Sequence, residues 1–366
     1  MLIANRMFLC ALVLFGNLFA PNLQAQEAES GFELRATVSA AANYSHRLSE
    51  VPRSGTPLAT GFRTMLYPNW KLSPHWTISG AVQVHSRPYF FEQFSTQGYG
   101  VKGDILQAHL SYSRFANNRS VVVRIGQLSS AFGSFLLRYD DAENPLIDMP
   151  QSYGYYYKSV SSQGLAGAQV DVTFRKMDAR AQWVNSSPTN RRSVFDTDQY
   201  GNWAGGVGYT IVQGFRVGAS GYYGPYLHRQ HRFFFSGEAN PRKLPASAQG
   251  IDVQWARGHW NANGEMHWFR KSYRAIPTVT QQAGYADVRR VLHPRWYLAA
   301  RAGYMNSSVS ARVGMLETAV GFRPNSHQLV KVGYQVQQGP QIRGTLGNTV
   351  ALQIVTVFRP ISIARD

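Results

Sequence analysis

Short stretches in which apolar and polar residues alternate recur sixteen times along the chain. In residues 328–337, for example, Val330, Val332 and Tyr334 alternate with polar or small neighbours. A period of two places such side chains on one face of a β-strand. The sixteen candidate strands are residues 32–44, 60–70, 76–86, 103–115, 120–127, 163–175, 178–186, 200–211, 215–223, 246–256, 260–271, 281–291, 296–304, 312–322, 328–337 and 348–358.

The connections between these strands alternate between two length classes. Short links occur at residues 71–75, 116–119, 176–177, 212–214, 257–259, 292–295 and 323–327, with longer links between them, including 305–311. Bacterial membrane barrels show this alternation, because their periplasmic turns are short and their outer loops are long. A large soluble β-sandwich would not show it. The pattern predicts an all-β fold, a 16-stranded antiparallel transmembrane β-barrel with a long third outer loop at 128–162.

The N-terminus has the three parts of a secretory signal peptide. Arg6 precedes an apolar stretch from Met7 to Phe19, and Leu23-Gln24-Ala25 forms a small-residue cleavage pattern. We expect residues 1–25 to be removed, residues 26–358 to form the barrel and residues 359–366 to form a C-terminal tail. Cys10, the single cysteine, lies in the signal peptide, so the mature chain can form no disulfide.

Composition agrees with a barrel in the cell outer membrane. The chain contains 33 Gly, 20 Tyr, 20 Phe and 8 Trp, with only 16% charged residues. Such a composition suits short, aromatic-rich strands, and no later segment has the 18 uninterrupted apolar residues of a membrane helix.

The inward faces of the predicted strands carry more cations than anions. The formal charge is +17, or +16 without Arg6. A basic lumen concentrates anions, so we expect anion preference; alternatively, many of these arginines pair with carboxylates and leave a modest field. The inward cations are Arg35, Arg63, Arg124, Arg175, Arg180, Arg216, Arg289, Arg301, Arg323 and Lys331, and the inward anions are Glu33, Asp171, Asp252, Glu265, Asp287 and Glu317.

The whole architecture resembles that of sixteen-stranded Gram-negative outer-membrane porins, in which a long third loop constricts the pore. A local likeness is Val123-Arg124-Ile125-Gly126-Gln127 running into Ser130-Ala131-Phe132-Gly133, which resembles the strand-to-loop transition of the phosphate-selective porin O and P family. The resemblance implies a passive pore for small hydrophilic solutes, a homotrimer and no cofactor. It also implies that Phe358 ends the last strand as a signal to the barrel assembly machinery. Residues 359–366 depart from that pattern.

The third loop then becomes the candidate constriction. It is acidic and rich in tyrosine, and its candidate residues are Arg138, Asp140, Asp141, Glu143, Asp148, Tyr153, Tyr155, Tyr156, Tyr157 and Lys158. If the loop folds inward, its carboxylates face the wall arginines across a narrow gap; alternatively it is a solvated lid. The tyrosines could stack on a sugar or aromatic solute, although packing of the loop on the wall is favoured because tyrosine buries a large area.

Other functions have weaker signals. Glu265 and His267 could form an acid–base pair, but no nucleophile motif accompanies them, so no enzymatic activity is expected. Histidine spacing predicts no metal site, and an exported chain with dispersed basic residues is not expected to bind nucleic acid. The main alternative is a non-conducting surface receptor or adhesin, whose basic and aromatic loop at 224–245 would bind lipopolysaccharide phosphates. Outer-membrane lipid, lipopolysaccharide and small solutes are the other expected partners.

Overall fold

The computed structural model describes residues 31–50, 56–87, 89, 100–153, 163–195, 199–227, 241–274, 276–339 and 347–364. The predicted signal peptide, Tyr155, Tyr156, Tyr157 and Lys158 lie outside these residues, as does most of the loop at 224–245. Among the described residues, no helix is both long and apolar enough to cross a membrane. The sixteen strands are β1 (Gly31–Tyr44), β2 (Leu58–Lys71), β3 (Trp76–Arg87), β4 (Gly100–Ala116), β5 (Arg119–Ser129), β6 (Gln163–Phe174), β7 (Met177–Val184), β8 (Asn202–Val212), β9 (Phe215–Pro225), β10 (Pro245–Arg257), β11 (Trp260–Lys271), β12 (Val279–His293), β13 (Trp296–Ser307), β14 (Ser310–Asn325), β15 (Gln328–Gln338) and β16 (Thr349–Ala364).

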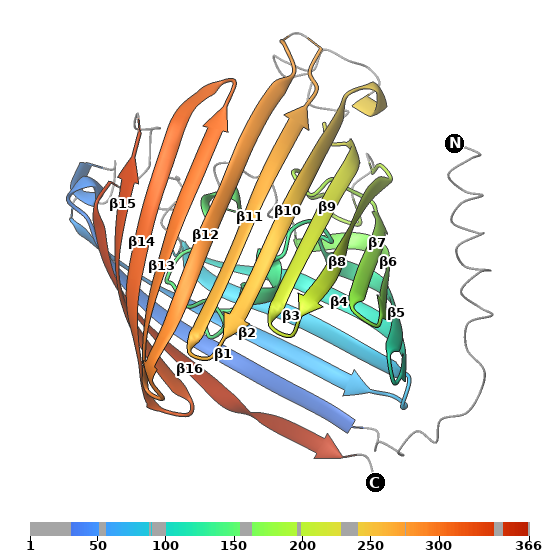
Figure 1. The fold of residues 1–366 in the computed structure, drawn as a ribbon, viewed down its shortest axis with the longest axis horizontal. Helices are drawn as coiled ribbons and strands as arrows, with labels where there is room; N and C mark the ends of the chain where they lie inside the picture. Colours follow the sequence, from blue (N-terminus) through green and yellow to red (C-terminus); the bar gives the residue numbers. More distant parts are fainter. Residues whose placement is uncertain are drawn as a thin grey trace.

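The strands close into one antiparallel barrel. Each strand pairs with its neighbours in the chain, and β1 pairs with β16 to complete the ring (Figure 1). Closure leaves no unpaired sheet edge along the shared length of the strands, which is the condition for a sheet to lie in a bilayer. The predicted sixteen-stranded all-β barrel is confirmed.

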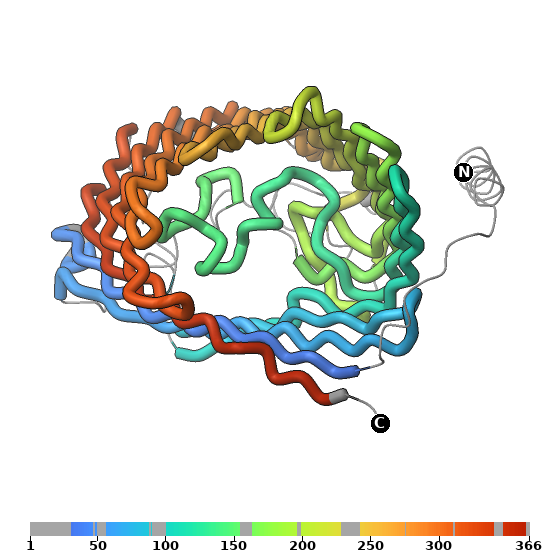
Figure 2. The backbone as a smooth tube through the Cα atoms, turned by 60° about the horizontal axis from the view of Figure 1, so that its bottom comes forward, coloured from blue at the N-terminus to red at the C-terminus, as the bar shows by residue number. Residues whose placement is uncertain are grey.

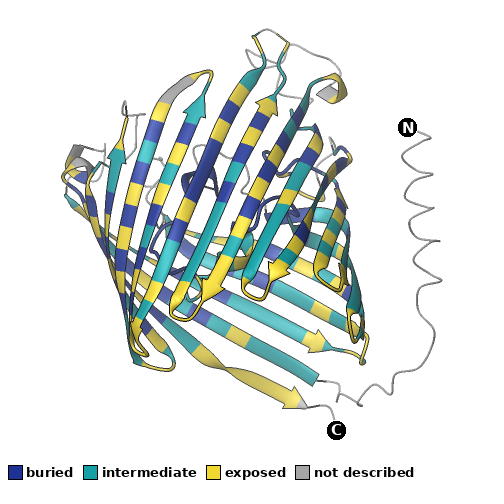
Figure 3. Ribbon diagram, viewed as in Figure 1, coloured by how far each residue is buried: buried dark blue, intermediate teal, exposed yellow. Residues whose placement is uncertain are grey.

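Alternation along each strand separates the two faces of the wall. On β16, Val350, Leu352 and Ile354 are exposed on the outside, whereas Ala351 and Gln353 between them are buried. Figure 3 shows this pattern as alternating bands of exposed and buried residues on most strands. The outward face is therefore apolar, as contact with lipid requires.

An aromatic band marks one end of the outer wall. Its side chains lie close to the short turns, at the end that faces the periplasm in bacterial barrels. Tryptophan and tyrosine favour the membrane–water interface, because an apolar ring and a polar group can be satisfied there together. The exposed members of the band are Trp70, Trp76, Phe174, Tyr209, Trp255, Trp260, Trp296 and Phe358.

Seven connections at this end contain only two to four residues, in agreement with the sequence pattern. One outer connection was predicted too long. Residues 305–311 were expected to form a longer loop, but β13 and β14 continue until Ser307 pairs with Ser310, leaving a two-residue link at 308–309. The main-chain pairing of two adjacent strands continues for as long as their backbones remain extended side by side.

The last strand is also longer than predicted. Phe358 faces outward opposite Ala36, but β16 continues to Ala364, and Ile361 and Ile363 pair with Leu34 and Phe32. The predicted separate tail is therefore strand over residues 359–364, and these residues do not turn into the lumen. Figure 1 shows this end of β16 extending beyond the neighbouring turns, because β1 begins early enough to pair with it.

The segment of residues 130–153, which follows β5, lies inside the barrel. Figure 2 shows it crossing the interior, where it contains the short 3-10 helices η3 (Phe135–Arg138) and η4 (Gln151–Tyr153). The largest apolar cluster among the described residues forms between this segment, here called the inner loop (residues 130–153), and the wall. It includes Phe132, Phe135 and Tyr153 of the inner loop with Tyr222, Phe269, Tyr285 and Met305 of the wall.

Two glycines permit this path. Gly126 has φ 136°, and a Cβ there would lie 2.4 Å from the Ala108 carbonyl oxygen of the paired strand. Gly133 has φ 78°, and a Cβ there would lie 2.0 Å from the Tyr153 hydroxyl oxygen. Both the backbone angle and the space therefore favour glycine at the bend where the chain leaves β5 and enters the lumen.

Candidate channel interior

The inner loop enters the lumen along β7 and β9. The side chain of Gln182 bonds the backbone where β5 ends and the loop begins: its oxygen accepts from Ala131 N at 3.0 Å, and its nitrogen donates to Ser129 O at 2.7 Å. Gly133 N donates to Ser220 Oγ at 3.2 Å. Phe132 then lies against Tyr222 and Phe269 with no solvent exposure. Backbone bonds and an aromatic anchor together fix the point of entry.

Glu265 on β11 fixes the next part of the loop. Its carboxylate accepts hydrogen bonds from Ser134 N at 3.1 Å, Ser134 Oγ at 2.8 Å and the Tyr153 hydroxyl at 2.6 Å. On the wall side it accepts from the Tyr285 hydroxyl at 2.6 Å and lies 2.9 Å from His267 Nε2. Burial and the nearby carboxylate raise the pKa of Tyr153 well above its usual value, so its hydroxyl remains a donor. We call this group the Glu265 anchor.

A second anchor joins the loop to β1, β2 and Tyr89. Arg63 Nη1 lies 3.0 Å from Asp141 Oδ1 and donates to Tyr139 O at 3.1 Å. Asp141 also accepts from Ser39 at 2.5 Å and Tyr89 at 2.8 Å. Burial alone would raise the pKa of Asp141, but the charges of Arg63 and Lys331 and these hydrogen bonds outweigh it and lower the pKa. Asp141 is therefore held as a carboxylate.

A third anchor binds the loop backbone rather than its side chains. Lys331 Nζ on β15 donates to three carbonyl oxygens, those of Asp141, Asn144 and Leu146, at 2.6, 2.8 and 3.1 Å. Beside it, Glu317 accepts from the backbone N–H groups of residues 147 and 148, both at 3.0 Å. The wall thus supplies a cation for carbonyl groups and an anion for amide groups, which fixes the course of the chain.

Arg301 on β13 links this anchor to the centre of the loop. It donates to Asp148 O at 2.8 Å and approaches the Glu317 and Asp287 carboxylates at 3.3 and 3.5 Å. Asp287 in turn accepts from Arg138 of the inner loop at 3.0 Å. These contacts form one continuous charged network, and Lys331, Arg301 and Arg63 are all 0% exposed.

Comparison with known proteins rests on the fold. No family model matches the chain, and no curated protein matches it in sequence. Among solved structures, in-vitro folded OmpT, an outer membrane protein of Vibrio cholerae, matches at 9% identity and a TM-score of 0.60, over 92% of this chain and 100% of that one. Salmonella typhi OmpF in complex with daunomycin matches at 10% identity and a TM-score of 0.59, over 91% and 100%. The outer membrane channel DcaP of Acinetobacter baumannii matches at 14% identity and a TM-score of 0.58, over 93% and 100%.

The chain is an outer-membrane β-barrel with the porin fold. Its location in the cell outer membrane agrees with the sequence analysis. At such low identity the matches establish architecture alone, and the narrower resemblance to the phosphate-selective porin O and P family stays a prediction.

The porin-fold barrel divides the predicted pore-lining cations into different groups. Arg63, Arg301 and Lys331 face inward but lie beneath the inner loop, so they anchor it and do not line an aqueous passage. Arg175 is not on the inner wall at all. It occupies the turn after β6 with φ 53°, and its guanidinium lies 5.4 Å from the Phe174 ring. The positive φ of the turn ends the alternation that had placed it inward.

The remaining predicted cations keep contact with solvent. Arg124 pairs with Asp171, and Arg216 pairs with Asp178 at 2.6 Å and Asp252 at 2.7 Å. Arg35, Arg180 and Arg323 are exposed or half-buried. Arg180 donates to Gly133 O at 2.6 Å. This bond joins the solvent-exposed part of the inner wall to the start of the inner loop.

The acidic residues of the loop also differ from expectation. Asp141 contacts Arg63 directly and Asp140 bonds the Tyr67 hydroxyl, so these charges do not oppose each other across a gap. Asp148 is buried, and Glu143 is exposed. Tyr153 is 1% exposed and packs against Phe135, which favours packing over solute stacking at this position.

Several anchoring residues escaped the sequence analysis. Alternation had placed Glu265 and Glu317 inward, but nothing local indicates that they bind backbone and hydroxyl groups of a loop more than a hundred residues away. The uncharged partners Ser134, Gln182 and Tyr285 gave no signal either. Polar residues with these roles are recognisable only once the loop is seen inside the barrel.

Proposed function

We propose that this protein is a passive porin for small hydrophilic solutes, with a preference for anions. The observation that carries the proposal is the solvent exposure of charged side chains on the inner wall of β5–β9. The Arg124 and Asp178 side chains are 32% and 40% exposed although they point into the barrel. Water therefore reaches the inner wall beside the fixed loop, and a wetted, charged wall is what a hydrophilic solute needs.

The preference for anions is supported by the distribution of ion pairs. Arg35, Arg180, Arg289 and Arg323 form no ion pair with any residue that the structure describes, whereas most inward carboxylates do. Cations outside ion pairs give the lumen a positive potential, which raises the local concentration of anions. Because four of the predicted cations are ion-paired and Lys331 is buried against carbonyl oxygens, we expect a modest preference.

A structural role for Glu265 and His267 supports the view that the protein is not an enzyme. Both side chains are almost fully buried, and the carboxylate is saturated by hydroxyl, amide and imidazole contacts. A general acid or base must reach the proton that it transfers. The trimer, the absence of a cofactor and the likeness to phosphate-selective porins remain part of the same proposal.

Reversal potential across a planar bilayer tests the proposal directly. The refolded mature protein is placed under a salt gradient beside Arg180→Gln, with Arg114→Gln as a control of the same chemistry near the periplasmic end of β4. We expect an anion-selective reversal potential that moves toward zero in Arg180→Gln and is unchanged in the control. A cation-selective current would overturn the preference.

Stable insertion without conductance would overturn the channel itself. That outcome would favour the alternative of a surface receptor or adhesin. Its candidate loop, residues 224–245, lies mostly outside the described residues, so the structure offers no contact that favours it.

A further inference from the structure

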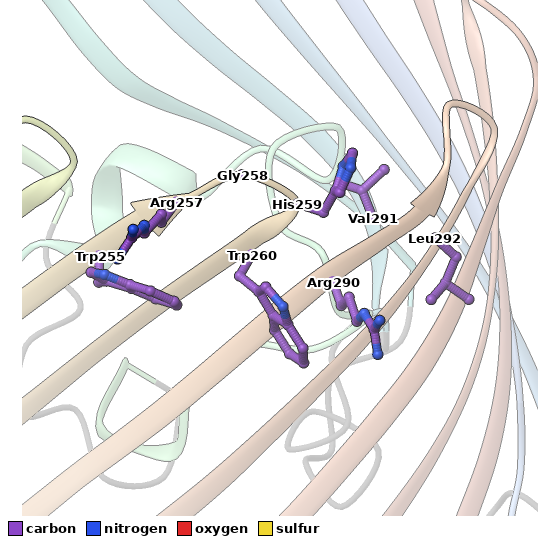
Figure 4. Close-up of a pocket in the computed structure, with 8 residues that line it drawn as sticks. All are labelled: Trp255, Arg257, Gly258, His259, Trp260, Arg290, Val291 and Leu292. Atoms are coloured by element: carbon purple, nitrogen blue, oxygen red, sulfur yellow. The ribbon is translucent and has the colours of Figure 1, made fainter.

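A cationic pocket lies on the outer wall at the periplasmic end of β10–β12. It has a volume of about 400 Å³ and is formed by the β10–β11 turn and the end of β12. Figure 4 shows Trp260 between Trp255 and Arg290, with Arg257 and His259 around the turn. The pocket has two arginines, one histidine and no carboxylate among its lining residues. It is therefore suited to a negatively charged group.

The position of Arg290 at this pocket is supported by an aromatic ring. Its guanidinium carbon lies 4.9 Å from the centroid of Trp260, the residue with which it pairs across β11 and β12. A cation over an indole face is attracted to it and loses freedom to move into solvent. The guanidinium is thereby held beside the ring, and Arg290 also lines the pocket.

An apolar groove of about 570 Å³ begins at the same two residues. Trp260 and Arg290 line both cavities. Its lining residues are partners on adjacent strands: Arg290 pairs with Leu298, Leu298 with Val320, and Val320 with Val332. The groove therefore crosses the outer wall obliquely from β12 to β15. It ends at Val350, the second residue of β16 and thus near the opposite end of the wall.

Small side chains make the groove deep at its centre. Ala300 and Thr318 pair with each other and lie between the larger Leu298, Val320 and Tyr334. A hydrocarbon chain could be accommodated over these small residues while its sides contact the larger ones. Because the lipid tails around the barrel are as apolar as the groove, the groove favours a chain through van der Waals packing against its walls.

We propose that the pocket and groove form one binding site for an anionic phospholipid of the periplasmic leaflet. The phosphate is bound by Arg290, Arg257 adds positive charge on the other side of Trp260, and an acyl chain follows the groove past Ala300 and Thr318. Arginine donates paired N–H groups to phosphate oxygens, and basic pockets at a membrane rim select anionic headgroups. Continuity between a cationic pocket at the interface and an apolar groove along the wall matches the two parts of this ligand. The site is independent of conduction through the lumen.

Lipid retention measures this binding. The mature protein is reconstituted in vesicles containing equal amounts of phosphatidylglycerol and phosphatidylethanolamine, transferred to a mild detergent, and examined by native mass spectrometry. One variant, Arg257→Gln/Arg290→Gln, removes the charges of the pocket. A second, Ala300→Phe, fills the groove and leaves the pocket intact. Arg114→Gln, a rim arginine outside the pocket, is the matched control, and a difference in mobility between unheated and heated protein on a denaturing gel verifies folding.

The wild-type protein should retain phosphatidylglycerol over phosphatidylethanolamine by several-fold. The double arginine variant should lose that preference, Ala300→Phe should retain less of both lipids, and the control should match the wild type. Excess inorganic phosphate should not displace the lipid, because it cannot occupy the groove. Two results would overturn the proposal: a wild-type protein that retains both lipids equally, or a loss of phosphatidylglycerol in Arg114→Gln equal to that in the double arginine variant. A third would also overturn it: variants that retain as much lipid as the wild type but dissociate an oligomer. That result would identify this face as a contact between copies of the chain.

Discussion

Two sectors of the inner wall carry the same kinds of charged residues and use them differently. Beneath the inner loop, Arg63, Arg301 and Lys331 are fully buried and bonded to the loop. On β5–β9, which the loop leaves partly open, Arg124 and Arg216 are paired but remain in contact with water. Strand alternation makes all five point inward. The position of the loop then determines whether a lumenal charge supports structure or influences permeation.

Energetics should follow the same division. A buried ion pair that loses one partner leaves a charge without compensation in a low dielectric, at a cost of about 3–5 kcal/mol. A pair in contact with water contributes about 0–1 kcal/mol, because solvent compensates each charge. Substitutions at equivalent alternation positions should therefore differ severalfold between the two sectors.

The largest effect is expected for Arg301→Met. This change removes the cation from Glu317 and Asp287 and a donor from Asp148 O, so the free energy of unfolding should fall by about 3–5 kcal/mol. Arg124→Met, which affects a pair that is about one-third exposed, should cost about 1 kcal/mol or less. Urea unfolding of both variants in detergent, followed by tryptophan fluorescence, gives the comparison. Equal losses would contradict the division into two sectors.

A smaller effect is expected at the Glu265 anchor. Glu265→Gln keeps the shape of the side chain but weakens the bonds from Ser134, Tyr153 and Tyr285, and a hydrogen bond to a charged group contributes about 1.5–3 kcal/mol. Tyr153→Phe removes one of these bonds to the carboxylate and should cost about 1.5–3 kcal/mol. Single-channel recording should show larger or noisier currents as the loop loosens. Tyr209→Phe, on the outer face, is the control and should leave the current unchanged.

The sequence predicted the wall much better than the interior. Alternation such as Val330, Val332 and Tyr334 is local, so it identifies a strand and its two faces without knowledge of its partners. The function of an inward residue depends on contacts with residues distant in the chain. Lys331 looked like any pore-lining cation, and only the loop carbonyl groups 185 to 190 residues away make it an anchor.

The ends of elements show the same limit. Arg175 followed the alternation of its strand until a turn with positive φ interrupted it. The extension of β16 did leave a signal, since Ile361 and Ile363 alternate with Ser362, but the resemblance to porins ended the last strand at Phe358. The structure accommodates this region with a register shift between Leu34 and Ala36 of β1, which returns both isoleucines to the outer face.

Acid should loosen the Asp141 anchor. The folded-state pKa of this carboxyl is lower than its ordinary value of 3.8, because Arg63, Lys331 and two hydroxyl donors favour the charged form against burial. A lowered folded-state pKa means that the stabilisation is complete above pH 3.8 and is lost as the pH falls through the folded-state value. One proton contributes at most about 1.4 kcal/mol per pH unit. Unfolding midpoints measured from pH 5 to pH 2 should fall less steeply in Asp141→Asn, and identical slopes would show that another group titrates.

The smallest effect is expected from exchanging charges in the open sector. Arg124→Asp combined with Asp171→Arg keeps one cation and one anion on paired strands that water reaches, so the free energy of unfolding should change by less than about 1 kcal/mol. The net lumenal charge is also unchanged, and the reversal potential should stay close to that of the wild type. The equivalent exchange beneath the loop, Arg63→Asp with Asp141→Arg, should prevent stable folding. Arg63 also donates to Tyr139 O, and Asp141 also accepts from the hydroxyl groups of Ser39 and Tyr89. The exchanged side chains cannot make these bonds. If the buried exchange were tolerated as well as the open one, net charge rather than the fixed geometry of the anchors would be what keeps the loop in place.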